Sequence, residues 1–338
     1  MKSVLVGISG GVDSSVAAML LKDKYKVIGC NMLLFNDDSK SSVDICNKLN
    51  IDFMKIDLKE EFRKEVINYF IYEYSNSRTP NPCIMCNKKF KFGLFYEFAK
   101  KNNIDFIATG HYAKIEYSDK YERYVLKKAD NISKDQSYFL YNIDKDILPY
   151  IIFPLSNYKS KDEIRKLAKE NNLNTASISD SQDICFIQND NYKVFLENNG
   201  IEKISGNIIL NNKIIGKHDG LYKYTIGQRK GLGIAYSSPL YVIGFNKEKN
   251  ELVVGEEKDL YVKSFKVKDY NLLLVDSIDK PIKVMVKTRY KSKEYKATIT
   301  MDNNYINVDF DEPQKGVTKG QSAVFYVDDI VLGGGIIA

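Results

Sequence analysis

The feature that most constrains the fold is a glycine-rich turn between a short strand and a helix at the start of the chain. Residues 2–7 predict a buried strand, because Val4 and Val6 are β-branched. The turn Ser9-Gly10-Gly11-Val12-Asp13-Ser14-Ser15 follows, and the apolar residues at 16–21 predict a helix. Glycines let the backbone approach a phosphate closely, and a helix N-terminus supplies partial positive charge. The turn therefore predicts a phosphate site.

Two familiar phosphate loops do not match this turn. It lacks the Gly-Lys-Ser/Thr of a Walker A loop and the Gly-x-Gly-x-x-Gly of a dinucleotide loop. An ordinary turn with Asp13 and Ser14 as helix caps is the competing interpretation. Adjacent glycines flanked by serines exceed what a cap needs, so we favour the phosphate site.

Strands and helices alternate over the first 110 residues. Further strands are predicted at 25–32, 52–56 and 105–109, and helices at 43–49, 60–74 and 90–98. Such alternation is typical of a parallel sheet with helices on both faces, which binds ligands at the carboxyl ends of its strands. The fold class is therefore α/β, with an N-terminal Rossmann-like parallel sheet.

The pattern becomes β-rich after about residue 200. Short strands are predicted at 208–210, 240–245, 252–254, 283–288, 296–300, 305–310 and 323–327. Turn residues separate them, among which we include Asp302-Asn303-Asn304 and a Gly333-Gly334-Gly335 tail. We expect a catalytic domain at 1–200, a basic, glycine-punctuated connector domain at 201–262 and a small C-terminal β-barrel domain at 263–338.

Composition narrows the compartment and the partners. No apolar run approaches the roughly 18 residues that span a bilayer, and the first run is too short for a signal peptide. Five cysteines in 338 residues do not make a disulfide scaffold, which favours the reducing cytoplasm. The net charge of +6 permits a polyanionic partner without requiring one. We expect a cytoplasmic protein that makes no membrane contact.

A proline-framed pair of cysteines is the most informative segment. Pro82 can begin a helix, so that Cys83 and Cys86 lie in its first turn. A helix N-terminus and the nearby Lys88 and Lys89 both favour thiolates there. These residues predict a reactive pair.

The remaining cysteines divide into two kinds. Cys30 and Cys46 lie in apolar contexts and are expected in the core, whereas Cys185 follows a polar segment. There is no second Cys-x-x-Cys, so a four-cysteine zinc site is incomplete. Three thiols at Cys83, Cys86 and Cys185 fit either a sulfur-transfer pair with one extra thiol or an iron–sulfur cluster with one open iron.

Longer motifs extend over essentially the whole chain. In order they are SGGVDSS at 9–15, TPNP at 79–82 with CN at 86–87, ATGHYA at 108–113, KDQSYFLY at 134–141, DSQDICFI at 180–187, GLYKYTIGQRKGLGI at 220–234, TRY at 288–290, FDEP at 310–313 and GQSAVFY at 320–326. With these motifs the chain resembles the tRNA-specific 2-thiouridylases, which are RNA thiolases of the ATP pyrophosphatase type. The resemblance implies an adenine nucleotide alpha hydrolase-like N-terminal domain.

The resemblance also implies an activity. ATP with Mg2+ would adenylate the C2 oxygen of the wobble uridine (position 34) in the anticodon arm of lysine, glutamate and glutamine tRNAs. Sulfur would then displace AMP and give 2-thiouridine. The sulfur donor would be a cysteine desulfurase, a sulfur-relay protein or free sulfide.

Residue roles follow from the same resemblance. Cys86 would be the nucleophile and Cys185 the persulfide carrier, and the two could form a disulfide after turnover. The residues implied for ATP are Gly7, Ile8, Ser9, Gly10, Gly11, Val12, Asp13, Ser14, Met32 and Gly110. Those implied for tRNA are His111, Lys134, Asp135, Gln136, Arg289, Tyr290 and Gln321.

One position departs from the family pattern. Cys83 stands where the usual NPD-x-x-CN has aspartate, so a role for that aspartate cannot be carried over. The change creates the Cys-x-x-Cys found in related thiolases, which hold a [4Fe-4S] cluster with three cysteines and bind hydrosulfide at the open iron. A cluster on Cys83, Cys86 and Cys185 is therefore an alternative to the persulfide route.

Three other functions compete. An amide-forming ligase with the same loop would need neither the cysteines nor the barrel. A non-catalytic RNA-binding protein would need neither the loop nor the cysteines. The same chemistry on another RNA, such as ribosomal RNA, would use all of these features.

Overall fold

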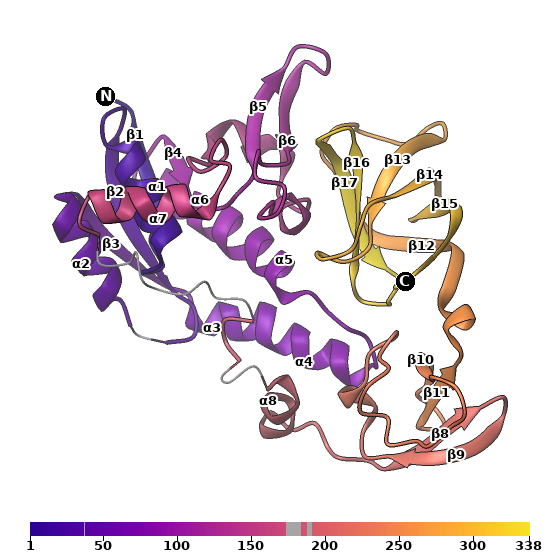
Figure 1. The fold of residues 1–338 in the computed structure, drawn as a ribbon. Helices are drawn as coiled ribbons and strands as arrows, with labels where there is room; N and C mark the ends of the chain where they lie inside the picture. Colours follow the sequence, from indigo (N-terminus) through magenta and orange to yellow (C-terminus); the bar gives the residue numbers. More distant parts are fainter. Residues whose placement is uncertain (37, 174–183, 188–190) are drawn as a thin grey trace.

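An open parallel sheet forms the N-terminal part of this computed structural model, which describes residues 1–36, 38–173, 184–187 and 191–338 (Figure 1). The strand order is β3-β2-β1-β4-β7, and all neighbouring strands are parallel. The strand order reverses between β1 and β4, so a ligand is expected at the carboxyl ends of these two strands. The strands are β1 (Ser3–Gly7), β2 (Lys26–Leu33), β3 (Asp52–Asp57), β4 (Phe106–Ala108) and β7 (Ile151–Ile152).

Helices cover both faces of this sheet. One face carries α1 (Val12–Leu21), α2 (Lys40–Leu49) and α7 (Lys161–Glu170), whose apolar residues share a core cluster with β1. Two long helical segments follow β3, and each contains a π-helical stretch. They are α3 (Lys59–Phe62), η1 (Arg63–Ile67) and α4 (Asn68–Ser75), then α5 (Pro82–Cys86), η2 (Asn87–Leu94) and α6 (Phe95–Lys101). Short helical segments are η3 (Ser137–Phe139), η4 (Lys145–Tyr150) and α8 (Tyr192–Asn198).

Two β domains complete the chain, as the sequence predicts. The connector is a four-stranded sheet, β10-β11-β8-β9, and six strands in the order β12-β15-β14-β13-β16-β17 close into a barrel through β12 and β17. The connector contains β8 (Gly206–Leu210), β9 (Lys213–His218), η7 (Leu221–Lys223), β10 (Tyr241–Asn246), β11 (Glu251–Gly255) and η8 (Glu257–Leu260). The barrel contains β12 (Tyr261–Leu272), β13 (Ile282–Lys287), β14 (Tyr295–Asp302), β15 (Tyr305–Lys315), β16 (Ser322–Val327) and β17 (Ile330–Ile337).

The structure corrects the prediction for the glycine tail. Gly333-Gly334-Gly335 is not a turn but the middle of β17, paired with both β16 and β12. A Cβ on Gly334 would lie 2.6 Å from the Ala323 carbonyl oxygen and 2.8 Å from the Tyr141 ring. The glycines are therefore required by close packing inside the barrel wall.

A hairpin within the N-terminal region was not predicted. It consists of β5 (Lys114–Ser118) and β6 (Arg123–Lys127), and Lys127 pairs with Ile330 of β17. The N-terminal region and the barrel therefore share one continuous sheet. Buried tyrosines reinforce this junction, because the Tyr138 hydroxyl donates to the Ser322 carbonyl oxygen at 2.9 Å and the Tyr141 hydroxyl lies 3.1 Å from Ser322 Oγ.

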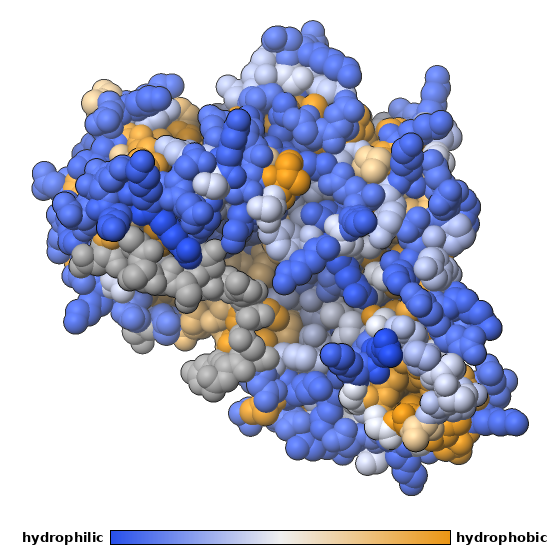
Figure 2. Space-filling view, viewed as in Figure 1, coloured by the Kyte–Doolittle hydropathy of each residue, from blue (hydrophilic) through white to orange (hydrophobic). Residues whose placement is uncertain are grey.

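Burial follows the sequence pattern. Cys30 and Cys46 are fully buried, as predicted. Figure 2 shows a mostly hydrophilic face, with hydrophobic residues gathered over the connector sheet. Among the described residues, no helix combines the length and apolar character needed to cross a membrane. The first part of the DSQDICFI motif lies outside the described residues.

Candidate functional site

The predicted phosphate loop lies between β1 and α1. Gly10 has a φ of +84°, in the left-handed region that favours glycine. The Ser9 amide donates to Ser14 Oγ at 3.2 Å, and Ser14 Oγ donates to the Gly11 carbonyl oxygen at 3.0 Å. Gly11 is the N-cap of α1 and makes no side-chain cap. Among the described residues, α1 therefore has no side-chain cap at its N-terminus, as a phosphate-binding helix N-terminus requires.

The loop after β4 closes against this turn. A Cβ on Gly110 would lie 2.8 Å from both the Asp13 carbonyl carbon and the Ser14 nitrogen. A Cβ on Gly7 would lie 3.5 Å from Met32 Cε of β2. The residues expected to bind ATP therefore come together at the reversal point of the sheet.

Two residues that the sequence analysis did not select hold Asp13. The Tyr112 hydroxyl donates to Asp13 Oδ1 at 2.8 Å, and Lys161 Nζ donates to Asp13 Oδ2 at 2.5 Å. Tyr112 belongs to the ATGHYA motif, which could have indicated it. Lys161 begins α7, 148 positions away, and no local signal in the sequence points to it.

The cysteine pair occupies the predicted helix start. Pro82 is the first residue of α5, after an Asn81 N-cap. Cys86 is only 7% exposed, Cys83 is half-buried and Cys185 is exposed. The cysteine pair therefore combines a nearly inaccessible thiol with a more accessible one.

Apolar packing brings Cys185 towards Cys86 although about a hundred residues separate them. Phe186, next to Cys185, makes edge-to-face contacts with Phe62 at 5.8 Å and Phe70 at 5.6 Å between ring centroids. Cys86 belongs to the same apolar cluster. Met32 packs against this cluster, so the thiols and the nucleotide loop share a neighbour.

The expectation of low thiol pKa values is wrong in this structure. Burial raises the pKa of Cys86 to about 12, and it also raises the pKa of Cys83. The pKa of the accessible Cys185 is raised to about 11, because surrounding protein displaces water and Cys83 lies nearby. A cation, Lys91, opposes these effects and lowers the pKa of all three thiols. Desolvation is the largest effect on each of these thiols and outweighs the opposing effect of Lys91.

The lysines chosen from the sequence have other partners. Lys88 donates to Asn142 Oδ1 at 3.2 Å, and Lys89 pairs with Glu65 at 3.6 Å. Lys91, which the sequence analysis missed, is the lysine that faces the thiols.

Lys91 also connects the thiols to the end of β4. Its Nζ lies 3.5 Å from His111 Nε2, and the other ring nitrogen of His111 lies 2.7 Å from Thr109 Oγ1. Burial and Lys91 lower the pKa of His111 well below its usual value, so the ring is neutral at pH 7. The Lys91 ammonium group thus links the helical segment that holds Cys83 and Cys86 to the carboxyl end of β4, next to the phosphate loop.

The three thiols do not form a ready metal site. Within residues 1–36, 38–173, 184–187 and 191–338, no group of three or more His, Cys, Asp or Glu side chains could hold a metal ion.

Lys134, Asp135 and Gln136, which are expected to contact tRNA, lie at the base of the β5–β6 hairpin. Asp135 is buried and accepts from the Ala129 amide at 3.0 Å and from Ser137 Oγ at 2.7 Å. Gln136 Oε1 accepts from the Tyr112 amide at 2.9 Å, and Lys134 is half-buried beside them. Gln136 therefore braces the loop that follows β4, whereas Asp135 braces the chain that follows β6.

The other expected tRNA contacts lie in the barrel. Arg289 donates to the Ile226 carbonyl oxygen at 2.9 Å and to Thr318 Oγ1. Tyr290 packs on Phe139 with ring centroids 4.4 Å apart. Gln321 donates to backbone carbonyls before α5. Each of these barrel side chains therefore contacts another domain of the protein.

The sheet, its phosphate loop and the adjacent thiols define a HUP-type nucleotide-binding protein with a cysteine-containing site. Three family models match in order: tRNA methyl transferase HUP domain at 2–189, tRNA methyl transferase PRC-barrel domain at 193–256 and aminomethyltransferase beta-barrel domain at 262–337. The chain is 43% identical over 354 residues to tRNA-specific 2-thiouridylase MnmA of Clostridioides difficile, covering 99% of this chain and 98% of that protein. It is 45% identical over 356 residues to the protein of that name from Acetivibrio thermocellus, covering 99% of both. The chain belongs to the tRNA-specific 2-thiouridylase family.

Proposed function

We propose that this protein is a tRNA-uridine 2-sulfurtransferase, which converts the wobble uridine of tRNA to 2-thiouridine and releases AMP and pyrophosphate. The observation that carries the proposal is the phosphate loop beside the buried Cys86, whose apolar cluster contains Phe186, the residue next to the accessible Cys185. The cation Lys91 acts on both thiols. Two of the family models are described as methyl transferases, but a phosphate loop with paired thiols supports the sulfur chemistry in the relatives' names.

The phosphate loop suits the activation step. The C2 oxygen of uridine attacks the α-phosphorus of ATP, and pyrophosphate leaves. The uncapped amides of α1 and the exposed Ser9 would hold the phosphates, and the Asp13 carboxylate is a suitable oxygen ligand for accompanying Mg2+. Activation is needed because oxygen at C2 leaves readily only as part of AMP.

The thiols suit the second step. The terminal sulfur of a Cys185 persulfide attacks C2, and AMP leaves with the former C2 oxygen. The Cys86 thiolate then attacks Cys185 Sγ, which breaks the persulfide S–S bond and frees 2-thiouridine. A Cys86–Cys185 disulfide remains, and an external thiol reductant must reduce it before the next turnover.

The partners follow from the same proposal. The anticodon arm of lysine, glutamate or glutamine tRNA would reach the site near His111, Lys134, Arg289 and Tyr290. A cysteine desulfurase or sulfur-relay protein would load Cys185, which is the accessible thiol. The reaction would take place in the cytoplasm.

The first test measures AMP and 2-thiouridine when the protein is incubated with ATP, unmodified tRNA and a persulfide donor. We expect Cys86→Ser and Cys185→Ser each to abolish thiolation, whereas Cys46→Ala, at a cysteine buried in the core beneath α2 and outside the cluster of Cys86, should retain it. Thiolation of ribosomal RNA in place of tRNA, or full activity without both cysteines, would overturn the proposal.

A second measurement separates the persulfide route from the cluster alternative. Protein purified without oxygen should thiolate tRNA while containing no stoichiometric iron. About four irons per chain, lost in Cys83→Ser together with activity, would replace the persulfide route with a three-cysteine cluster.

A further inference from the structure

The segment that precedes the cysteine helix is bound to the barrel. Residues 76–81 connect α4 to α5 and contain the carbonyls of Thr79 and Pro80. Gln321 Nε2 donates to the Thr79 carbonyl oxygen at 2.8 Å and to that of Pro80 at 3.4 Å. The Thr79 amide donates in return to the Lys319 carbonyl oxygen at 3.0 Å. Pro82, the first residue of α5, comes two positions after Pro80.

The barrel loop approaches this segment too closely for a side chain at its centre. Gly320 has a φ of +89°, and a Cβ there would lie 3.0 Å from both Arg78 Cβ and the Thr79 nitrogen. The loop is also fixed to the barrel wall. The Gly320 amide donates to the Ile337 carbonyl oxygen at 3.0 Å, and the Ile337 amide donates to the Gln321 carbonyl oxygen at 2.8 Å. Movement of the barrel wall would therefore move the segment.

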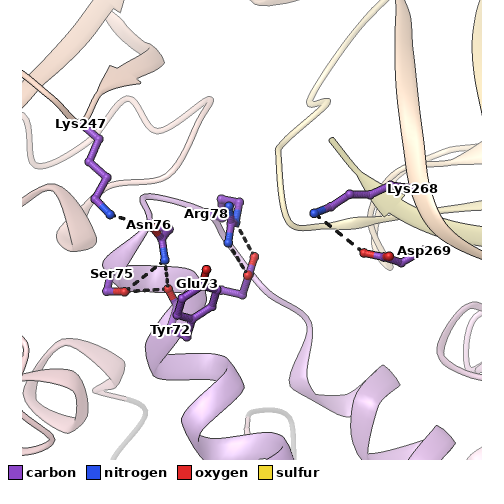
Figure 3. Close-up of polar contacts among 8 residues, drawn as sticks. All are labelled: Tyr72, Glu73, Ser75, Asn76, Arg78, Lys247, Lys268 and Asp269. Atoms are coloured by element: carbon purple, nitrogen blue, oxygen red, sulfur yellow. Dashed lines mark hydrogen bonds and ion pairs between the residues drawn. The ribbon is translucent and has the colours of Figure 1, made fainter. Parts of the chain in front are cut away.

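The connector holds the same segment from its other end. Lys247 Nζ donates to Asn76 Oδ1 at 2.7 Å, and Arg78 makes two hydrogen bonds of 2.7 Å to the nearly buried Glu73 (Figure 3). Arg289 ties the connector to the barrel loop through Ile226 and Thr318. The connector and the barrel therefore both contact residues 76–81 of the N-terminal region, which directly precede α5.

We propose that Gln321 is a positioning residue, which holds the Thr79–Pro80 backbone and thereby sets the placement of Cys86. The proposal rests on the proposed function only in taking Cys86 as the nucleophile. α5 is the first five residues of the helical segment that continues through η2 and α6, so the chain that enters it fixes the end of the helix at which Cys83 and Cys86 lie. Loss of the Gln321 amide leaves two partly buried carbonyls without this donor, so the segment becomes free to rearrange.

The test is the alkylation rate of Cys86 by iodoacetamide in the full-length, tRNA-free protein, followed by mass spectrometry of peptides. Cys86 is nearly inaccessible, so we expect Gln321→Ala to increase the rate roughly fivefold, the factor for one ordinary hydrogen bond. Gln321→Lys keeps a donor that can reach the carbonyls and should restore the wild-type rate. In thiolation assays, Gln321→Ala should lower kcat more than it raises the KM for tRNA.

The matched control is Gln314→Ala. Gln314 lies in the same barrel, but its side chain donates only to the Glu312 carbonyl oxygen within β15. This variant should leave the Cys86 rate unchanged. If Gln321 were only a tRNA contact, Gln321→Ala would raise the KM for tRNA and leave alkylation unchanged, which would overturn the proposal. Alkylation requires no turnover, so it tests positioning even if wild-type protein fails to thiolate tRNA.

Discussion

Burial and a nearby lysine have opposite effects on the pKa of the buried thiols. Burial, helped by the neighbouring Cys185 and Cys83, raises the pKa of Cys86 to about 12, far above neutral pH. The Lys91 ammonium group opposes this effect and lowers the pKa. At pH 7 the thiol form therefore dominates in the tRNA-free protein, and the small thiolate fraction depends on one ammonium group.

This balance predicts a pH profile. Because the pKa lies above the working range, the thiolate fraction of Cys86 should rise about tenfold per pH unit from pH 7 to 10, without a plateau. Lys91→Met removes the favourable cation, raises the pKa further and should slow Cys86 alkylation about tenfold at each pH in that range. Mass spectrometry of alkylated peptides measures both. Lys89→Met, at an exposed pair with Glu65, is the control, and identical profiles for Lys91→Met and wild type would contradict the prediction.

The sequence predicts the wrong lysines as neighbours of the thiols. The sequence pattern indicates the cysteine pair and its proline-framed helix start, and the structure confirms that helix. It selected Lys88 and Lys89 because they are adjacent in sequence. From Asn87 the helix is π-helical, so a residue five positions on, Lys91, follows Cys86 by one turn. No propensity in the sequence indicates a π-helix, so the orientation of the three lysines could not be predicted.

The glycine run Gly333-Gly334-Gly335 in β17 predicts that a substitution there lowers the stability of the barrel. A Cβ on Gly334 would collide with the Ala323 carbonyl oxygen and the Tyr141 ring. Gly334→Ala should therefore lower the free energy of unfolding by about 1–3 kcal/mol, the usual cost of overpacking. Denaturant unfolding measures it. Gly244→Ala in β10, where a new Cβ would meet only Val253 at 4.0 Å, should change stability much less, and equal losses would refute the packing argument.

The elements themselves were predictable to different degrees. The first four strands of the N-terminal sheet and the helices between them were predicted because their apolar periods are clear and the turns between them are polar, whereas β7 and α7 were not predicted. The glycine run was misread because glycine usually marks turns, whereas here it allows two strands and a tyrosine ring to approach. The hairpin β5–β6 was missed because its tip and exposed tyrosines give no apolar face until the barrel is present.

At the scale of the whole molecule, the barrel completes the core of the N-terminal region. Tyr138 and Tyr141 are fully buried, and both hydroxyls reach Ser322 of β16. The edge of β6 is paired with β17. One core cluster contains Tyr138 and Tyr141 of the N-terminal region together with Val324 and Tyr326 of the barrel.

This shared core predicts that the chain truncated after residue 262 does not keep its native packing. Without β16 and β17, the two tyrosines are exposed and the edge of β6 is open to solvent. We expect a melting temperature at least about 10 °C lower than that of the full chain, together with increased binding of a hydrophobic dye. Full-length Tyr141→Phe, which removes only the hydroxyl contact with Ser322, should change stability by about 1 kcal/mol. A truncated chain that melts like the full protein would show that the N-terminal region folds alone, and the barrel would then reach Cys86 only through its surface contacts with residues 76–81.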